Sequence, residues 1–218
     1  MSSGTEIIDR LVNGDESSFR EFVEEYKDKA MSLTIKILKN PDEAQDSLQE
    51  AFIKFYRALA QNRFLGKSKP STYFYTIVYN TALDHYKKIK RTSFSMISID
   101  VNESNFKEGD ELISRFNQTE IDRNVLPEDN SINTDKVISS KEIQNIVSTY
   151  IEHLPEQYSV ILNMFYINEL SHNEICDILD LPLGTVKNRI FRAKEKVRSL
   201  ILKKYSEEEA FKKAIEKN

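Results

Sequence analysis

Residues 171–200 read SHNEICDILDLPLGTVKNRIFRAKEKVRSL, a stretch that changes from acidic and apolar to strongly basic across a Pro-Leu-Gly-Thr break. Ser171 with Glu174 three residues later has the pattern of a capping box, which predicts a short helix from His172 to about Leu179. A longer helix is expected from about residue 184, because apolar residues recur there at helical spacing: Val186, Ile190, Ala193, Val197 and Leu200. Two helices joined by a tight turn form a helix-turn-helix, whose second helix can lie in the major groove of DNA.

The second helix of this pair carries the candidate DNA contacts. Residues 184–204 contain eight Lys or Arg and one acidic residue. A helical wheel places the candidates opposite the apolar stripe or on its flanks: Thr185, Lys187, Asn188, Arg189, Phe191, Arg192, Lys194 and Lys196. Arg can bond guanine through two hydrogen bonds, Asn can bond adenine, Phe can touch a thymine methyl group, and Lys suits phosphate. A solvated basic helix is the alternative, but the capped helix and the turn before it favour DNA binding.

The N-terminal part predicts three further helices that share one core. They span residues 15–38, then Pro41 to about 59, and then roughly 71–91. Their apolar residues fall on one face of each helix: Phe19, Phe22, Val23, Tyr26, Ala30, Leu33 and Ile37 in the first, Ala44, Leu48, Ala51, Phe52, Phe55 and Leu59 in the second, Phe74, Ile77, Val78, Ala82 and Ile89 in the third.

The middle of the chain has a different composition. Residues 92–140 contain ten acidic and four basic residues with few apolar ones, which favours a linker with one short helix near 110–116. We therefore expect an all-α fold of two helical domains joined by a long acidic linker. The domains are 1–91 and 136–204, the linker is 92–135, and 205–218 is a tail with a short helix from near residue 206 and no assigned role. Helices over about 137–153 and 155–167 precede the helix-turn-helix.

Several classes of protein are disfavoured. No apolar run is long enough to cross a bilayer and the N-terminus lacks a signal segment, so we expect a cytoplasmic protein without membrane insertion. One Cys and three scattered His give no metal site. No nucleophile has a matched base and no Gly-rich loop could cradle a phosphate. We expect neither an enzyme, nor a catalytic residue, nor a cofactor.

Two parts of the chain resemble a known family. LPEQYSVILNMFYINELSHNEICDILDLPLGTVKNRIFRAKEKV, residues 154–197, resembles region four of bacterial sigma factors, particularly the small extracytoplasmic-function (ECF) group of the sigma-70 family. NGDESSFREFVEEY (13–26), PDEAQDSLQEAFIKFYRAL (41–59) and TYFYTIVYNTALDHYKK (72–88) resemble region two of the same group. Two matches in the right order are more specific than a helix-turn-helix alone.

The resemblance implies a role for each part. The Asp-x-x-Gln-Glu pattern of region two implies that Asp46, Gln49 and Glu50, with Lys54 beside them, bind core RNA polymerase. The third helix and the loop before it would bind and open the minus-ten promoter element, where cations and aromatic faces such as Tyr73, Tyr75, Tyr79 and Tyr86 suit single-stranded DNA. The candidates there are Arg63, Lys67, Ser68, Lys69, Tyr73, Asn80, Lys87, Lys88 and Arg91. The alternative for several tyrosines is a place in the core.

The leading hypothesis is thus a dissociable transcription initiation subunit. Its expected partners are core RNA polymerase, promoter DNA in double-stranded and melted form, and an anti-sigma or recruiting factor. The helix-turn-helix would bind the minus-thirty-five element, and the acidic linker would mimic RNA in the exit path. A freestanding repressor or activator would not need the acidic face around Asp46. A DNA-cutting or recombining enzyme with a helix-turn-helix tail is the third, weaker alternative.

Overall fold

The computed structural model describes residue 10, residues 15–97 and residues 150–215 of the 218-residue chain. Every regular element in these ranges is helical. α2 spans Glu16–Leu38, α3 spans Pro41–Ala60 and α4 spans Pro70–Ile97. η1 spans Ile151–His153, α7 Glu156–Leu162, the π-helical η2 Asn163–Ile167, α8 His172–Leu179 and α9 Leu183–Ile215. The expected all-α fold is confirmed. Residues 92–97 of the predicted linker belong to α4, while the rest of the linker and its short helix lie outside the described residues.

The first three helices form a bundle around aromatic side chains. α2, α3 and α4 each pack against the other two. Phe74 of α4 lies at the centre, with its ring 5.2 Å from those of Phe22 and Phe55 and 4.8 Å from that of Phe52, centroid to centroid. Phe22, Phe55 and Phe74 are fully buried. Since these rings come from the apolar stripes of all three helices, the stripes form one core, as the periodicity predicts.

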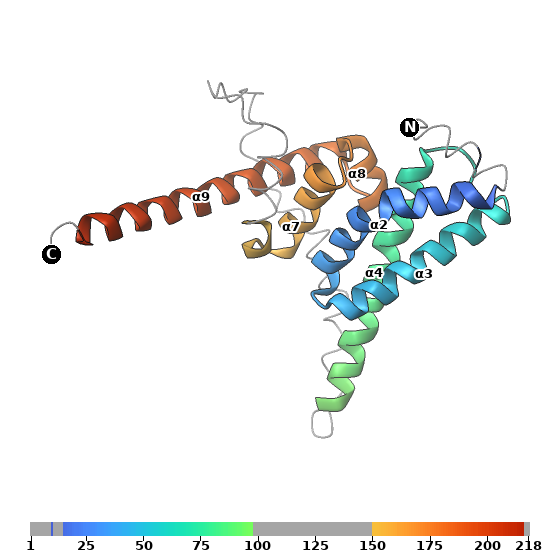
Figure 1. Cartoon of the computed structure of the whole chain (residues 1–218), viewed down its shortest axis with the longest axis horizontal. Helices are drawn as coiled ribbons and strands as arrows, with labels where there is room; N and C mark the ends of the chain where they lie inside the picture. The colour runs from blue at the N-terminus through green and yellow to red at the C-terminus, as the bar shows by residue number, and fades with distance from the viewer. Residues whose placement is uncertain (1–9, 11–14, 98–149, 216–218) are drawn as a thin grey trace.

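Local residues fix where the helices of this bundle begin and end. The Asn40 side chain accepts hydrogen bonds from the backbone N–H groups of Asp42 and Glu43, and Pro41 occupies the first turn of α3. Lys39, which ends α2, has a φ of 57°. This left-handed residue turns the chain sharply between α2 and α3. The two helices can therefore pack side by side (Figure 1).

The second group of helices is built on α9. α7 and α8 both pack against α9, while α4 contacts α8 and α2 contacts α7 and η2. All of these elements share one continuous set of buried apolar side chains. The packed part of the molecule thus contains both helical groups, and α9 and the C-terminal part of α4 extend from it (Figure 1).

Two helices are longer than the sequence pattern predicts. α4 continues to Ile97 instead of ending near residue 91, and α9 continues as one helix to Ile215 instead of being followed by a separate helix from near residue 206. The sequence contains no Gly or Pro between residues 71 and 97 or between 185 and 215. Neither helix therefore contains a helix-breaking residue in these ranges.

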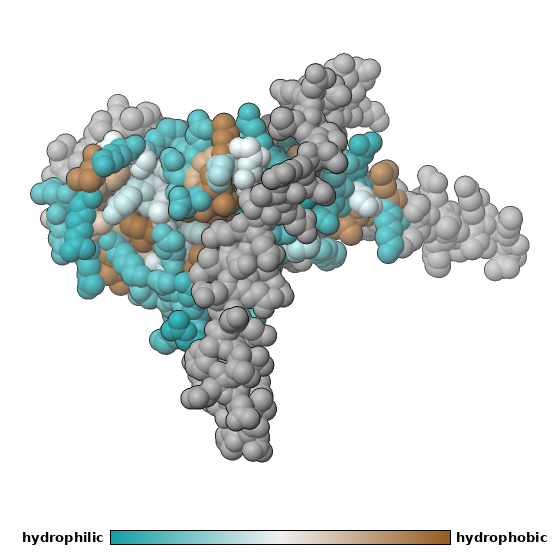
Figure 2. Space-filling view, turned by 180° about the vertical axis from the view of Figure 1, so that it is seen from behind, coloured by the Kyte–Doolittle hydropathy of each residue, from teal (hydrophilic) through white to brown (hydrophobic). Residues whose placement is uncertain are grey.

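The surface described on the back of the molecule is mainly hydrophilic, with small separate hydrophobic areas (Figure 2). None of the described helices is long and apolar enough to cross a membrane.

Candidate nucleic-acid interface

The helix-turn-helix is built from α8 and α9. Ser171 caps α8, since its hydroxyl accepts a hydrogen bond from the backbone N–H of Glu174, whose carboxylate accepts one in return from the backbone N–H of Ser171. This is the predicted capping box. Asp180 ends α8 with a φ of 52°, a left-handed conformation that makes the turn tight. α9 begins three residues later, at Leu183.

One side of α9 is held in the core, which leaves the rest of the helix for binding. Val186, Ile190, Ala193 and Val197 are buried, as the apolar spacing predicts. Lys187, Phe191, Lys194 and Lys196 are exposed, whereas Thr185, Asn188 and Arg192 are half-buried. Of the eight candidate DNA contacts, seven are thus accessible at least in part.

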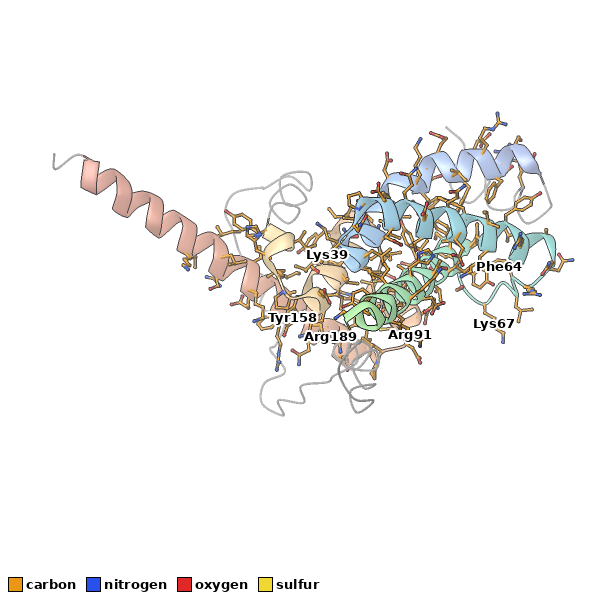
Figure 3. The ribbon with its side chains drawn as sticks, turned by 90° about the horizontal axis from the view of Figure 1, so that it is seen from below. Lys39, Phe64, Lys67, Arg91, Tyr158 and Arg189 are labelled. Atoms are coloured by element: carbon orange, nitrogen blue, oxygen red, sulfur yellow. The ribbon has the colours of Figure 1, made fainter. Side chains whose placement is uncertain are left out.

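Arg189 is the exception among the eight candidates. It is only 7% exposed. Burial lowers the pKa of its guanidinium, and the nearby Tyr79 of α4 and Tyr158 of α7 act in the opposite direction. Arg189 and Tyr158 lie close together in Figure 3. In this conformation, therefore, the side chain of Arg189 faces protein and cannot reach DNA.

Two of the exposed lysines lie over aromatic rings. The ammonium of Lys194 is 5.4 Å from the ring centroid of Phe165 and 5.7 Å from that of Tyr166. The ammonium of Lys196 is 5.2 Å from the ring centroid of Tyr158. Such contacts hold a cation in place without neutralising it. Both side chains are exposed, so a phosphate can reach them.

His172, at the start of α8, reports on the electrostatics of this surface. Its ring stacks on Phe165 with centroids 5.0 Å apart. Burial lowers the pKa of His172, and the charges of Lys187 and Lys194 lower it further. The positive potential of Lys187 and Lys194 therefore extends from α9 across the turn to the start of α8. A surface of this kind attracts the DNA backbone.

The loop between α3 and α4 carries the candidate minus-ten contacts. Arg63, Lys67 and Lys69 are exposed and Ser68 is half-buried. Phe64 anchors the loop by packing on Tyr73, with ring centroids 5.3 Å apart, while Lys67 points outward (Figure 3). The ammonium of Lys69 is 3.0 Å from the carboxylate of Glu174 in α8.

The tyrosines of α4 differ in exposure. Tyr75 and Tyr79 are buried, and burial raises the pKa of Tyr79 to about 12 and that of Tyr75 further. The two tyrosines therefore lie in the core, which is the alternative that the sequence left open, and they offer no stacking face in this conformation. Tyr73 and Tyr86 are half-buried.

The other polar candidates on α4 lie at the surface. Asn80, Lys88 and Arg91 are exposed and Lys87 is half-buried. They remain accessible to a nucleic acid.

The outer face of α3 carries the polymerase-binding candidates, and Asp46, Gln49, Glu50 and Lys54 are all exposed. One oxygen of Glu50 is 2.8 Å from the ammonium of Lys54, and the other is 2.8 Å from Nε2 of His85 in α4. Hydrogen bonds from His85 and then Lys54 lower the pKa of Glu50. Glu50 is thus held in one orientation and stays ionised.

The structure adds apolar residues to these surfaces that the sequence analysis did not select. Ile53 and Tyr56 on α3 are 44% and 41% exposed, and Leu183 at the start of α9 is 41% exposed. Ile53 lies four residues after Gln49, and Tyr56 lies three residues after Ile53, so they share one helix face. That spacing could have identified them.

The chain matches known proteins over most of its length. Residues 22–92 match the family model for Sigma-70 region 2, and residues 144–197 match that for Sigma-70, region 4. The ECF RNA polymerase sigma factor SigW of Bacillus subtilis is 35% identical over 191 residues, which are 88% of this chain and 92% of that protein. The ECF RNA polymerase sigma-E factor of Escherichia coli K12 is 34% identical, with 88% and 90% covered.

A solved structure shares the fold at lower identity. CnrH, in its complex with the cytosolic domain of CnrY, superimposes with a TM-score of 0.54 and 14% identity, covering 89% of this chain and 94% of that one. The helix-turn-helix, the N-terminal bundle and the relatives at 34–35% identity all indicate the same family. The chain belongs to the extracytoplasmic-function group of the sigma-70 family of RNA polymerase sigma factors, which are promoter-specific transcription initiation factors and not enzymes.

Proposed function

We propose that this chain directs core RNA polymerase to promoters by using α9 at the minus-thirty-five element, α4 with its preceding loop at the minus-ten element, and the outer face of α3 on the polymerase. The observation that carries the proposal is the composition of α9. One side of α9 is buried in the core, and the other sides of the helix present Lys187, Phe191 and Arg192. This role places the protein in the cytoplasm, with the polymerase.

Base recognition at the minus-thirty-five element is assigned to the N-terminal half of α9. Thr185, Asn188 and Arg192 project from one side, and an Arg or Asn with two hydrogen bonds to a base edge distinguishes base pairs by about 1–3 kcal/mol. Lys187, Lys194 and Lys196 supply phosphate contacts, which fix the position of the helix but carry no sequence information.

The loop from residue 61 to 69 is assigned to the unpaired bases of the minus-ten element. Phe64 is anchored on Tyr73, and Leu65 beyond it is 73% exposed. Gly66 has a φ of 67°, which suits glycine and turns the loop outward. An exposed apolar side chain between the cations Arg63 and Lys67 is suited to contact a base taken out of the stack.

Polymerase binding is assigned to Asp46, Gln49, Glu50 and Lys54, with Ile53 and Tyr56 as an apolar part of the same surface. The exposed apolar residues support this assignment, because protein interfaces combine an apolar centre with a polar rim. A freestanding repressor or activator would not require such a face. Binding of this chain to an anti-sigma factor or a recruiting factor stays a prediction.

The experiment that tests the DNA assignments is genome-wide run-off transcription with purified chain and bacterial core polymerase. Sequencing the 5′ ends of the transcripts identifies the promoter elements directly. We expect Asn188→Ala with Arg192→Ala to lower run-off from those promoters by roughly tenfold or more, from the loss of two base contacts. Ser199→Ala, an exposed change farther along α9, is the matched control. Equal run-off from the double variant and the control would contradict the assignment of α9.

A further inference from the structure

Two side chains of α4 bind polar side chains on the outer face of α3. Glu50 and Lys54 lie four residues apart on α3, and Thr81 and His85 lie four residues apart on α4, so each pair shares one helix face. The two helices pack against each other (Figure 1). Nε2 of His85 is 2.8 Å from one carboxylate oxygen of Glu50, and the ammonium of Lys54 donates to the hydroxyl oxygen of Thr81 at 3.2 Å. Since Lys54 also pairs with Glu50, the four side chains form one network.

The hydrogen bond between His85 and Glu50 has one possible direction. An ionised carboxylate can only accept, so Nε2 of His85 is the donor. This bond is the largest cause of the lowered pKa of Glu50, ahead of the bond from Lys54. Nδ1 of the same ring is 3.7 Å from the carboxylate of Glu43. The ring of His85 therefore lies between two acidic side chains of α3.

The network leaves Glu50 able to bind a partner. Each carboxylate oxygen offers about two acceptor sites, and Lys54 and His85 each bind a different oxygen. The side chain of Glu50 is 46% exposed, whereas that of His85 is 19% exposed. Thr81 is buried. A partner that binds this face therefore meets Glu50 and Lys54, with His85 and Thr81 beneath them.

Fixing Glu50 and Lys54 before binding favours binding. A long side chain that is free in solution loses rotational freedom when an interface fixes it, which weakens affinity by about two- to tenfold for each side chain. Bonds from α4 restrict both side chains in the free protein. Less freedom is then left to lose when the partner binds.

We propose that His85 and Thr81 are positioning residues for polymerase binding, which act from α4 by fixing the orientation of Glu50 and Lys54 on α3. The inference rests on the proposed function, which assigns Glu50 and Lys54 to the polymerase. It gives α4 a second role beside the minus-ten element, because the same helix determines how the polymerase-binding side chains are presented.

The test is a double-mutant cycle on the affinity of the full chain for bacterial core RNA polymerase. His85→Ala removes the donor, Glu50→Ala removes its acceptor, and the double variant removes both. His85→Gln keeps an N–H donor. His153→Ala, at an exposed position of η1, is the matched histidine control. Urea unfolding of each variant distinguishes a loss of affinity from a loss of stability.

We expect His85→Ala to weaken polymerase binding by about two- to tenfold, the effect of freeing one side chain. In the Glu50→Ala background the same substitution should change affinity by less than about twofold, because His85 acts through Glu50. His85→Gln should restore most of the affinity, and His153→Ala should leave it unchanged. For Lys54, Thr81→Val should weaken binding, whereas Thr81→Ser, which keeps the hydroxyl, should not.

The outcomes separate the inference from the proposed function. Full affinity in His85→Ala, or an equal loss with and without Glu50, would overturn the positioning role of His85, since a direct contact or a general loss of stability gives the second result. Equal affinity of Thr81→Val and Thr81→Ser would overturn the role of Thr81. Full affinity in Glu50→Ala, or no polymerase binding by the unsubstituted chain, would instead contradict the proposed function, and the inference with it.

Discussion

Glu174 links the cap of α8 to the α3–α4 loop. Replacing Glu174 should lower the free energy of unfolding by an amount that depends on pH. Burial would raise the pKa of Glu174, but hydrogen bonds from the hydroxyl and backbone N–H of Ser171 and from Lys69 outweigh it and set the pKa at about 2, against an ordinary value of 4.5. A difference of this size corresponds to at most about 3 kcal/mol of folding free energy at neutral pH.

The sign of the pH dependence follows from the lowered pKa. Because the folded chain holds the ionised form more tightly than the unfolded chain, the stabilisation is complete above about pH 5 and is lost as the pH falls toward 2. Glu174→Gln keeps the shape of the side chain and removes the charge. The difference in unfolding free energy between the original chain and Glu174→Gln should fall from at most about 3 kcal/mol at pH 7 to at most about 1.4 kcal/mol at pH 3, both reduced by solvent screening.

Urea unfolding followed by circular dichroism from pH 3 to pH 7 measures this difference. Asp177→Asn, which removes a negative charge from an exposed position of α8, is the control and should change stability by less than about 0.5 kcal/mol. A difference between Glu174→Gln and the original chain that stays constant over this pH range would refute the reasoning.

Three further predictions concern the N-terminal bundle. Phe74→Ala removes the central ring of the aromatic core and should lower the unfolding free energy by about 3–5 kcal/mol in urea titrations, whereas Leu202→Ala at an exposed position should leave it nearly unchanged. Asn40→Ala removes the cap of α3 and should cost about 1 kcal/mol in the same titration, and an unchanged midpoint would contradict the capping role. His85→Ala removes the largest cause of the lowered pKa of Glu50, so that carbon-13 NMR titration should show this pKa moving back toward its ordinary value.

Periodicity predicted the helices that fold around apolar stripes. Ala44, Ala51, Phe55 and the other stripe residues of α3 are buried because a helix with one apolar and one polar face has only one way to face a core. The capping box at Ser171 was equally predictable, since both of its members lie within four residues. Local sequence carries the information for both features.

The exposure of the candidate site residues depends on contacts between residues that are distant in sequence. Tyr79 lies among cations and polar residues in the sequence, a pattern equally suited to stacking on bases and to a core position. In the structure, Tyr79 is buried because it packs against the second group of helices. Arg189 lies on the flank of α9 in a helical wheel, but α4 and α7 cover it. Contacts across more than one hundred residues, such as Asn168 with Lys29, have no periodic pattern in the sequence.

The most direct test of the central claim is the affinity of the purified chain for bacterial core RNA polymerase, measured beside the variant Asp46→Arg with Gln49→Ala. Both substitutions are at exposed positions of α3, so the helical content by circular dichroism should not change. Gln61→Ala, beyond the end of α3, is the matched control. Binding by the original chain and the control, with loss of binding in the double variant, is the predicted result. Equal affinity for all three proteins would contradict the assignment of this face, and no binding by any of them would contradict the role as an initiation subunit.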